Sequence, residues 1–243
     1  MRVAVISDIH GNLPALESVL DEIEGEDLQH VWCLGDTVGY GADPNDCCRL
    51  VRDTTDVVLA GNHDLAVCGT LPTDDFSRGA AIAAEWTREV LEDGHRRWLS
   101  GRPAAGAIAD VGLYHGSPRN PIWEYVLSAL LAELCFDATE QRINLIGHSH
   151  VALGFERQEG ENATGERRRA GDAADISSGE WLLNPGSVGQ PRDGDPRAAW
   201  LLLDLDLQRA EWRRTEYDIG RAQQAIRAAR LPDSLAERLH YGQ

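Results

Sequence analysis

Two short stretches of the sequence each place two potential metal ligands one residue apart at the end of an apolar run. Asp8 and His10 stand in "SDIHGN", and His148 and His150 stand in "LIGHSHV". Residues two apart in an extended backbone point to the same side, so each pair can reach one ion or two adjacent ions. Taken alone, such a pair more often marks a surface turn than a metal site. Residues elsewhere in the sequence are needed to choose between these two interpretations.

Residues of the same chemical types follow other apolar runs: Asp36 in "GDTVGYG", Asn62, His63 and Asp64 in "GNHD", and His115 in "HGSP". Each has a simpler interpretation as a helix cap, a turn or a satisfied core histidine. Turn chemistry alone would not place seven potential ligands after five successive strands. These seven are Asp8, His10, Asp36, Asn62, His115, His148 and His150. Their carboxylate, imidazole and amide groups suit divalent transition metals such as Mn, Fe, Ni or Zn.

The apolar runs before these residues have the length of strands that are buried on both faces. These runs stand at the start of segments 3–12, 30–41, 57–64, 111–118 and 143–150. Segment 180–190 has the same pattern of an apolar run followed by polar residues. Residues 13–26 carry apolar side chains at helical spacing, with Pro14 near the start and Gly25 near the end. Strands that alternate with helices imply largely parallel pairing, which gathers the loops after the strands on one rim. We therefore expect the polar residues to converge.

The remaining segments predict further elements of one domain that spans residues 1–243. Residues 76–99 predict one or two helices, and residues 198–218 predict a β-hairpin that two short helices follow. Residues 155–180 are poor in apolar side chains and rich in glycine and charge. We expect them to form a mobile hairpin loop or an insertion.

The composition limits the partners of the protein. The net charge is −17, and all 23 basic residues are arginines. Such a balance repels polyanions and argues against an extended nucleic-acid-binding surface, so an anionic substrate needs a local source of positive charge. The first residues read as a strand rather than a signal peptide, and no apolar stretch is long enough to cross a bilayer. The five cysteines show no Cys-x-x-Cys spacing, which is typical of free thiols in a reducing compartment. We therefore expect a soluble cytoplasmic protein.

The ordered motifs "SDIHGN", "GDTVGYG", "GNHD", "HGSP" and "GHSH", with "NPGSVGQPRDGDPRA" after them, resemble the calcineurin-like metallophosphoesterase superfamily. The similarity is closest to its compact bacterial and archaeal phosphodiesterases and extends from the first strand to about Ala198. It implies an α/β fold, a four-layer αββα sandwich of two mixed sheets flanked by helices. It also implies a site for two divalent metal ions (Mn, Fe, Ni or Zn) at one rim, and among these we favour Mn.

The resemblance assigns a role to each matching residue. It implies that Asp8, His10 and His150 bind one metal ion and that Asn62, His115 and His148 bind the other. Asp36 would bridge the two ions, and His63 would be the catalytic histidine beside the scissile group. Asn12 and Arg192 are expected to contact the substrate.

The second motif departs from the Ser/Thr protein phosphatases of this superfamily. There it continues Gly-Asp-x-Val-Asp-Arg-Gly, where the later Asp supports the catalytic His and the Arg holds phosphate. Gly39 and Tyr40 occupy those places here. The departure argues against protein phosphatase activity, leaves Asp64 as a candidate catalytic partner of His63, and suggests that Arg192 or Arg119 supplies the phosphate contact.

We therefore expect a phosphodiesterase that hydrolyses a small phosphodiester or a nucleotide. The resemblance implies attack by a hydroxide that bridges the metals and protonation of the leaving group by His63. The alternatives are a dinucleoside polyphosphate hydrolase, a protein phosphatase, a nuclease of the same superfamily, and a catalytically silent interaction scaffold on the same fold. A nuclease would need a basic groove, which the charge balance opposes.

Overall fold

The computed structural model describes residues 1–243 and contains two mixed β-sheets of six strands each. The first sheet has the strand order β3-β2-β1-β11-β12-β9, in which β1, β2 and β3 pair in parallel and β11 is antiparallel to β1. Its strands are β1 (Arg2–Ile6), β2 (His30–Cys33), β3 (Val57–Val58), β9 (Ala173–Asp175), β11 (Ala198–Asp204) and β12 (Arg209–Thr215).

The second sheet has the strand order β4-β5-β6-β10-β7-β8, in which β5, β6 and β10 pair in parallel. Its strands are β4 (Ala105–Ile108), β5 (Val111–Tyr114), β6 (Ile143–Leu145), β7 (Ala152–Arg157), β8 (Thr164–Arg167) and β10 (Glu180–Pro185). The six strands predicted from apolar runs are therefore present in the two sheets, as is the predicted C-terminal hairpin, β11 and β12.

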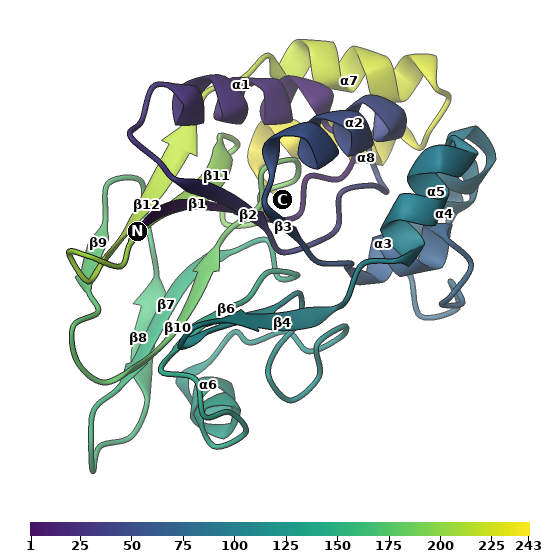
Figure 1. Cartoon of the computed structure of the whole chain (residues 1–243). Coiled ribbons are helices and arrows are strands. Elements are labelled where there is room, and N and C mark those ends of the chain that lie inside the picture. The colour runs from purple at the N-terminus through teal and green to yellow at the C-terminus, as the bar shows by residue number, and fades with distance from the viewer.

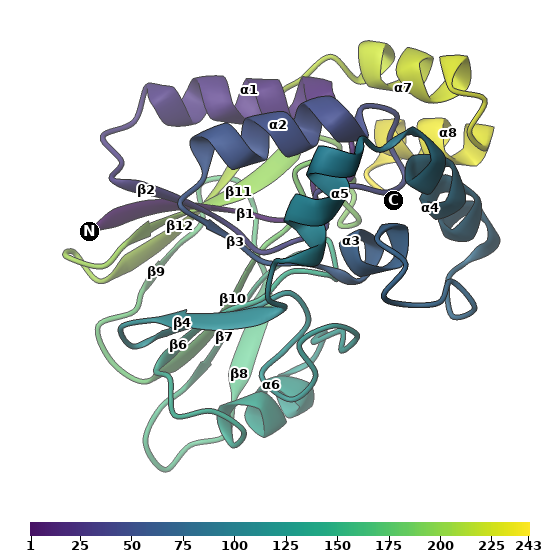
Figure 2. The same ribbon diagram turned by 45° about the vertical axis from the view of Figure 1, so that its right-hand side comes forward.

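The helices cover the outer faces of the two sheets and one end of the sandwich (Figures 1 and 2). Helices α1 (Leu13–Glu24), α2 (Pro44–Thr54) and α7 (Ile219–Ala228) lie over the first sheet, and α6 (Ala129–Phe136) lies against the second. Helices α3 (Asn62–Val67), α4 (Arg78–Val90), α5 (Asp93–Ser100) and α8 (Asp233–Tyr241) lie toward the end where β1, β2 and β3 finish. The longest helix, α4, has 13 residues, which is too short to cross a bilayer.

Three apolar layers hold this arrangement together. Along β1, Val3 and Val5 face the core between the two sheets, whereas Ala4 and Ile6 face the core under α1 and α2. This alternation follows from the period of two in a strand. A third core, which includes Phe136 of α6, covers the outer face of the second sheet. The predicted four-layer α/β sandwich of two mixed sheets is therefore confirmed.

Residues 155–180, for which we expected a mobile hairpin loop, contain regular structure. β8 forms a hairpin with β7, and β9 crosses to the first sheet and pairs with β12. All four residues of β8 are exposed, so backbone hydrogen bonds rather than apolar burial define this strand. Apolar patterns are the sequence signal for strands, and β8 lacks one.

A buried ion pair anchors the loop before β11. The side chains of Asp193 and Arg214 are 6% and 3% exposed and contact each other directly. Asp193 Oδ2 also accepts a hydrogen bond from the backbone N–H of Ala152 (3.2 Å), so the carboxylate ties the loop to β7. Removing one partner of such a pair leaves a buried charge without compensation.

Asp193→Ala is therefore expected to lower the free energy of unfolding by about 3–5 kcal/mol, measured by urea denaturation followed by circular dichroism. Asp233→Ala is the matched control, because it removes an ion pair with Arg227 in which both side chains are about half exposed. That control should lose no more than about 1 kcal/mol. Equal losses in the two variants would contradict the anchoring role of Asp193.

Candidate metal centre

The loops that follow the strands bring all seven predicted ligands to one rim of the sandwich. Asp8 and His10 follow β1, Asp36 follows β2, Asn62 begins α3, His115 follows β5, and His148 and His150 lie between β6 and β7. Each of the seven is at most 4% exposed. The structure brings these residues together as predicted. Their side chains form two outer groups, and a third group of His10, Asp36 and His63 overlaps both.

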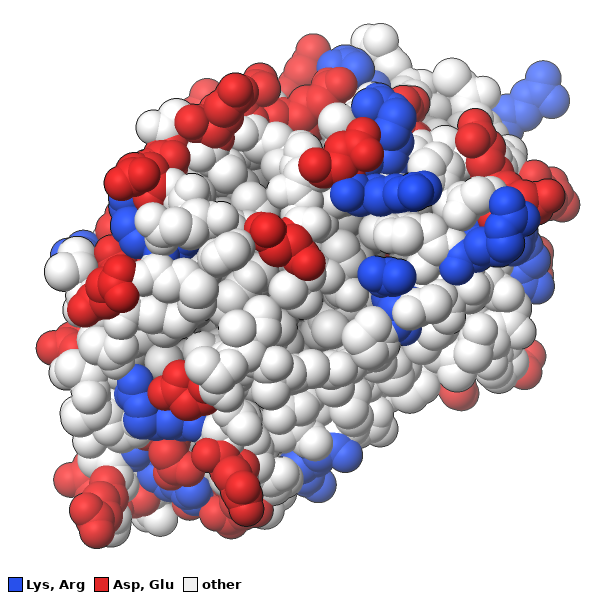
Figure 3. Space-filling model, in the orientation of Figure 1, with Lys and Arg blue, Asp and Glu red and all other residues white.

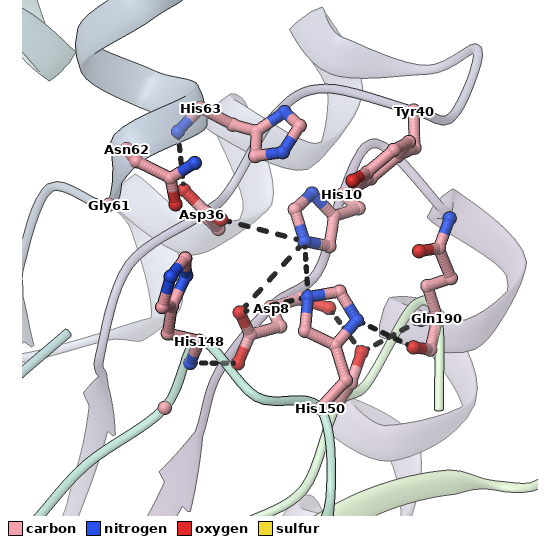
Figure 4. A network of polar contacts seen from close by, with 12 residues as sticks. Asp8, His10, Asp36, Tyr40, Gly61, Asn62, His63, His148, His150 and Gln190 are labelled. Atoms are coloured by element: carbon pink, nitrogen blue, oxygen red, sulfur yellow. Dashed lines mark hydrogen bonds and ion pairs between the residues drawn. The ribbon is translucent and has the colours of Figure 1, made fainter. Parts of the chain in front are cut away.

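The first group contains Asp8, His10 and His150, whose nearest donor atoms lie within 4.8 Å of one another (Figure 4). His10 Nδ1 lies 3.1 Å from the carbonyl oxygen of Val38, and His150 Nδ1 lies 2.7 Å from that of Gln190. A carbonyl can only accept, so each Nδ1 carries the proton and each Nε2 has a free lone pair. The two Nε2 atoms are 3.1 Å apart, and two facing lone pairs repel unless a cation lies between them.

The second group contains Asp36, His115 and His148. His115 Nδ1 lies 3.0 Å from the carbonyl oxygen of Leu34, which directs His115 Nε2 into the site. This Nε2 atom lies 3.2 Å from His148 Nδ1 and 3.4 Å from Asp36 Oδ2. Asn62 Oδ1 is 3.2 Å from the same nitrogen and adds an amide oxygen to the group.

Asp36 lies between the two groups. Its Oδ1 atom accepts a hydrogen bond from the backbone N–H of His63 (2.9 Å), which fixes the orientation of the carboxylate. Its Oδ2 atom lies 3.6 Å from His10 Nε2 in the first group and 3.4 Å from His115 Nε2 in the second. A single carboxylate oxygen is therefore within reach of an ion in either group.

Several buried polar atoms of the site have no hydrogen-bond partner. They are Asp8 Oδ1, Asp36 Oδ2 and His148 Nε2. Each buried polar atom without a partner costs about 1–3 kcal/mol, and metal ions in the site would satisfy the two carboxylate oxygens, because each offers a lone pair. The mixture of imidazole, carboxylate and amide donors matches divalent transition metals. The residues therefore fit a metal site.

The backbone is strained at the same positions. Asp8, His10, Asp36, His148 and His150 all have left-handed φ angles, between 50° and 63°. Residues with a side chain rarely adopt this region, at a cost of order 1–3 kcal/mol each, and such strain concentrates at functional sites. Five of the seven potential ligands share it, so the loops are bent to aim these side chains inward.

Burial determines the protonation of His10, His148 and His150, whereas the Asp36 carboxylate raises the pKa of His115 to about 9 against the effect of burial. Burial lowers the pKa of His10 and of His150 well below the ordinary value, and it lowers the pKa of His148 to about 3. These imidazoles are neutral near pH 7 and keep a lone pair for a metal. Burial by itself would raise the pKa of Asp36, but the adjacent histidines, His115 first, hold it below the ordinary value.

His63 lies beside the first group without a polar partner. Its Nδ1 atom is buried and makes no hydrogen bond, and its ring packs against Tyr40 and Phe76 at centroid distances of 4.4 and 4.6 Å. A Cβ atom on Gly39 would come within 2.5 Å of His63 Nδ1, so a side chain at position 39 would collide with the imidazole in this position. The His63 ring is held by aromatic packing.

Asp64 does not partner His63, so this prediction was wrong. The Asp64 carboxylate accepts hydrogen bonds from the backbone N–H groups of Thr37 (3.3 Å), Val38 (3.1 Å) and Gly61 (3.1 Å). It joins the loop after β2 to the start of α3 and thereby holds two ligand-bearing segments together. The residue is a positioning residue rather than a catalytic one.

The structure also places the three residues that were expected to contact substrate. Asn12 caps α1 by accepting a hydrogen bond from the N–H of Ala15 (3.3 Å), and it donates one to the carbonyl of Gly189 (2.8 Å). Its side chain therefore joins loops and does not line the open cleft above the candidate metal ligands. Arg119 pairs with Glu124 (3.2 Å), also outside the cleft. Arg192, by contrast, lines the cleft over the metal ligands.

This cleft has a volume of about 860 Å³ including its open mouth. Besides the candidate ligands and Arg192, it is lined by Phe76, Trp123, Tyr125 and Arg238, which the sequence analysis did not identify. These four lie on loops or on α8, away from the recognisable motifs, and no local pattern marks them. Their position becomes apparent only once the chain is folded.

Gly61 offers a test of the site that leaves every ligand unchanged. A Cβ atom at this position would lie 2.0 Å from Asp36 Oδ1, so Gly61→Ala must displace the carboxylate. Losing a group that holds a metal ligand in place lowers metal affinity about 10–100-fold. We expect a loss of this size when the Asp36 carboxylate is displaced. The measurement is calorimetric titration with Mn²⁺. Gly94→Ala on α5 is the control, because its Cβ atom would meet nothing within 4 Å; unchanged affinity in Gly61→Ala would contradict the geometry.

The fold and the cluster of candidate metal ligands indicate a protein of the metallophosphoesterase class. Comparison with known proteins supports this class. Residues 1–207 match the sequence model of the calcineurin-like phosphoesterase superfamily domain, and the chain belongs to this superfamily. The predicted resemblance is thereby confirmed. Family membership and the cluster of potential ligands support a hydrolase that acts on phosphoester bonds.

Two relatives extend over nearly the whole chain, and a third matches less than half of it. The crystal structure of a metallophosphoesterase from Sphaerobacter thermophilus has a TM-score of 0.90 at 41% identity and covers 100% of this chain and 99% of its own. An uncharacterised protein of Methanocaldococcus jannaschii is 38% identical over 99% of this chain and 98% of its own length. A symmetrical bis(5'-nucleosyl)-tetraphosphatase of Actinobacillus pleuropneumoniae is 31% identical over 42% of this chain and 39% of its own length.

Proposed function

We propose that the protein is a dinuclear metal-dependent phosphodiesterase that acts on a small phosphodiester or a nucleotide. The observation that carries the proposal is the position of Asp36 Oδ2, which lies 3.6 Å from His10 Nε2 and 3.4 Å from His115 Nε2. One ion would be held by Asp8, His10 and His150, and the other by Asn62, His115 and His148, with Asp36 bridging both. Mn²⁺ is the ion we favour for both positions.

Two divalent ions at these positions would supply a Lewis acid for the phosphate and a water of lowered pKa as nucleophile. The residues of the chain would do the rest. Arg192 would place positive charge beside the phosphate groups of the substrate. His63 would give a proton to the leaving oxygen. Burial lowers the pKa of His63 to about 4, and an anionic phosphate in the cleft would raise it again because negative charge favours the imidazolium form.

The charge distribution supports a small substrate rather than a polyanion. The chain carries a net charge of −17, and acidic and basic side chains are interspersed on the face drawn in Figure 3, without a continuous basic band. Bound cations and Arg192 would instead concentrate positive charge inside the cleft. A small phosphoester would fit this distribution, whereas a long nucleic acid would meet an acidic exterior.

A dinucleoside polyphosphate hydrolase is the second candidate. The similarity to the symmetrical bis(5'-nucleosyl)-tetraphosphatase favours it, although that similarity covers 42% of this chain. A protein phosphatase is less well supported, because Gly39 and Tyr40 occupy the places of the supporting Asp and the phosphate-binding Arg.

The test is a paired assay on the purified protein after its bound metals have been measured. Bis(4-nitrophenyl) phosphate and 4-nitrophenyl phosphate are compared in the presence of Mn²⁺. The proposal predicts turnover that requires the metal and a higher kcat/KM for the diester. A preference for the monoester would contradict the diesterase assignment, and inactivity on both with no retained metal would favour an interaction scaffold.

A further inference from the structure

Two arginines from the C-terminal part of the chain contact one aromatic ring beside the metal site. The guanidinium carbons of Arg192 and Arg238 lie 5.6 and 5.9 Å from the centroid of the Tyr40 ring. That ring is itself 4.4 Å from the ring of His63 and 4.7 Å from the ring of His10 (Figure 4). Both positive groups are therefore neighbours of the site where the phosphate would be cleaved.

Neither guanidinium pairs with the side chain of an Asp or a Glu. Arg192 Nη2 donates to Gln190 Oε1 (2.8 Å) and to the Tyr40 hydroxyl (3.3 Å), and its buried Nε has no partner. Arg238 donates through Nε to the main-chain oxygen of Gln243, while its two Nη groups have no protein acceptor. Asp75 lines the same cleft but is exposed and pairs with neither arginine.

Two partly buried like charges near each other are unfavourable without an anion. Burial and repulsion by Arg192 both lower the pKa of Arg238, which reflects this cost. The contact with Tyr40 offsets only part of it, because a cation–π contact is weaker than a paired charge. A phosphate accepts several hydrogen bonds from guanidinium groups and would complete the arrangement.

Aromatic side chains line the same cleft. Phe76 and Trp123 meet edge to face at 5.8 Å, and Tyr125 stacks on His148 at 4.2 Å while 44% of its surface stays exposed. Exposed aromatic faces next to positive charge suit a planar base that is joined to phosphate. A simple alkyl phosphoester would leave this aromatic surface unused.

We propose that Arg192 and Arg238 bind a second anionic group of the substrate, next to the phosphate that is cleaved, and that the aromatic side chains hold a nucleobase. The substrate class is then a nucleotide with at least two phosphate groups. This inference rests on the proposed function and makes Arg238 of α8 a residue that determines specificity.

Three substrates test the contributions of the base and of the second phosphate separately. Bis(4-nitrophenyl) phosphate has neither, the 4-nitrophenyl ester of thymidine 5'-phosphate has a base and one phosphate, and diadenosine tetraphosphate has bases and several phosphates. Arg238→Gln should lower kcat/KM for the tetraphosphate by about 10–100-fold relative to the thymidine ester, the size of one lost charged hydrogen bond. Arg238→Lys keeps the charge and should recover part of the loss. Arg97→Gln on α5 removes one exposed arginine elsewhere and should keep the wild-type ratio.

A binding measurement supplies a readout that does not depend on turnover. Calorimetry should show that the wild-type protein binds ADP at least about 10-fold more tightly than AMP, and Arg238→Gln should remove most of this difference. Equal losses on all substrates, or no preference for ADP in the wild type, would overturn the second subsite. If none of the three substrates is cleaved, the proposed function fails, while the ADP and AMP titrations still decide whether the subsite exists.

Discussion

Asp36→Asn is expected to abolish turnover and to remove both metal ions. Asp36 Oδ2 faces both groups of candidate ligands, and the amide that replaces the carboxylate carries no negative charge. Loss of an outer partner alone costs about 10–100-fold in metal affinity, and loss of a shared ligand should exceed this. The measurement is metal content by mass spectrometry after dialysis against Mn²⁺, together with the rate of diester hydrolysis.

Asp75→Asn is the matched control for this variant. It makes the same carboxylate-to-amide change in the same cleft, but at an exposed residue that belongs to neither group. It should retain both ions. If Asp36→Asn also binds two ions at full occupancy, Asp36 does not bridge the site.

His63→Ala is expected to lower kcat by about 10²–10⁴-fold while metal content stays unchanged. His63 belongs to neither predicted ligand set, and its ring is held by Tyr40 and Phe76 beside the site. If it protonates the leaving oxygen, the loss should be largest for an alkoxide leaving group and smaller for 4-nitrophenolate, which needs little assistance. Steady-state rates for a nucleotide diester and for bis(4-nitrophenyl) phosphate measure this difference.

His95→Ala, in α5, provides the control for loss of an imidazole outside the cleft. Its kinetics should match those of the wild type with both leaving groups. A defect in His63→Ala that is the same for both leaving groups would exclude proton donation by His63 and would point to a role in binding.

The fold was predictable where burial leaves a pattern in the sequence. The apolar runs before Asp8 and Asp36 are strands between two cores, and the run before His148 is a strand that packs on the central core. The position of each candidate ligand followed from the end of its strand. The sequence did not reveal β8, whose residues are all exposed, because its pairing is made by the backbone alone. Apolar periodicity carries no information about such a strand.

The convergence of the candidate ligands was predictable, but the residues that surround them were not. Asp64 and Asn12 belong to the motifs, but short polar side chains compete for backbone N–H groups, and both serve the loops instead of the cleft. Trp123 and Arg238 were missed because their place depends on how distant loops and α8 meet at the rim. Such tertiary contacts have no local signature in the sequence.

The most direct test of the two-metal assignment is anomalous diffraction from a crystal soaked in Mn²⁺. The account predicts two peaks, one among Asp8, His10 and His150 and the other among Asn62, His115 and His148, with Asp36 coordinating both. A single peak, or no anomalous density between these residues, would contradict it.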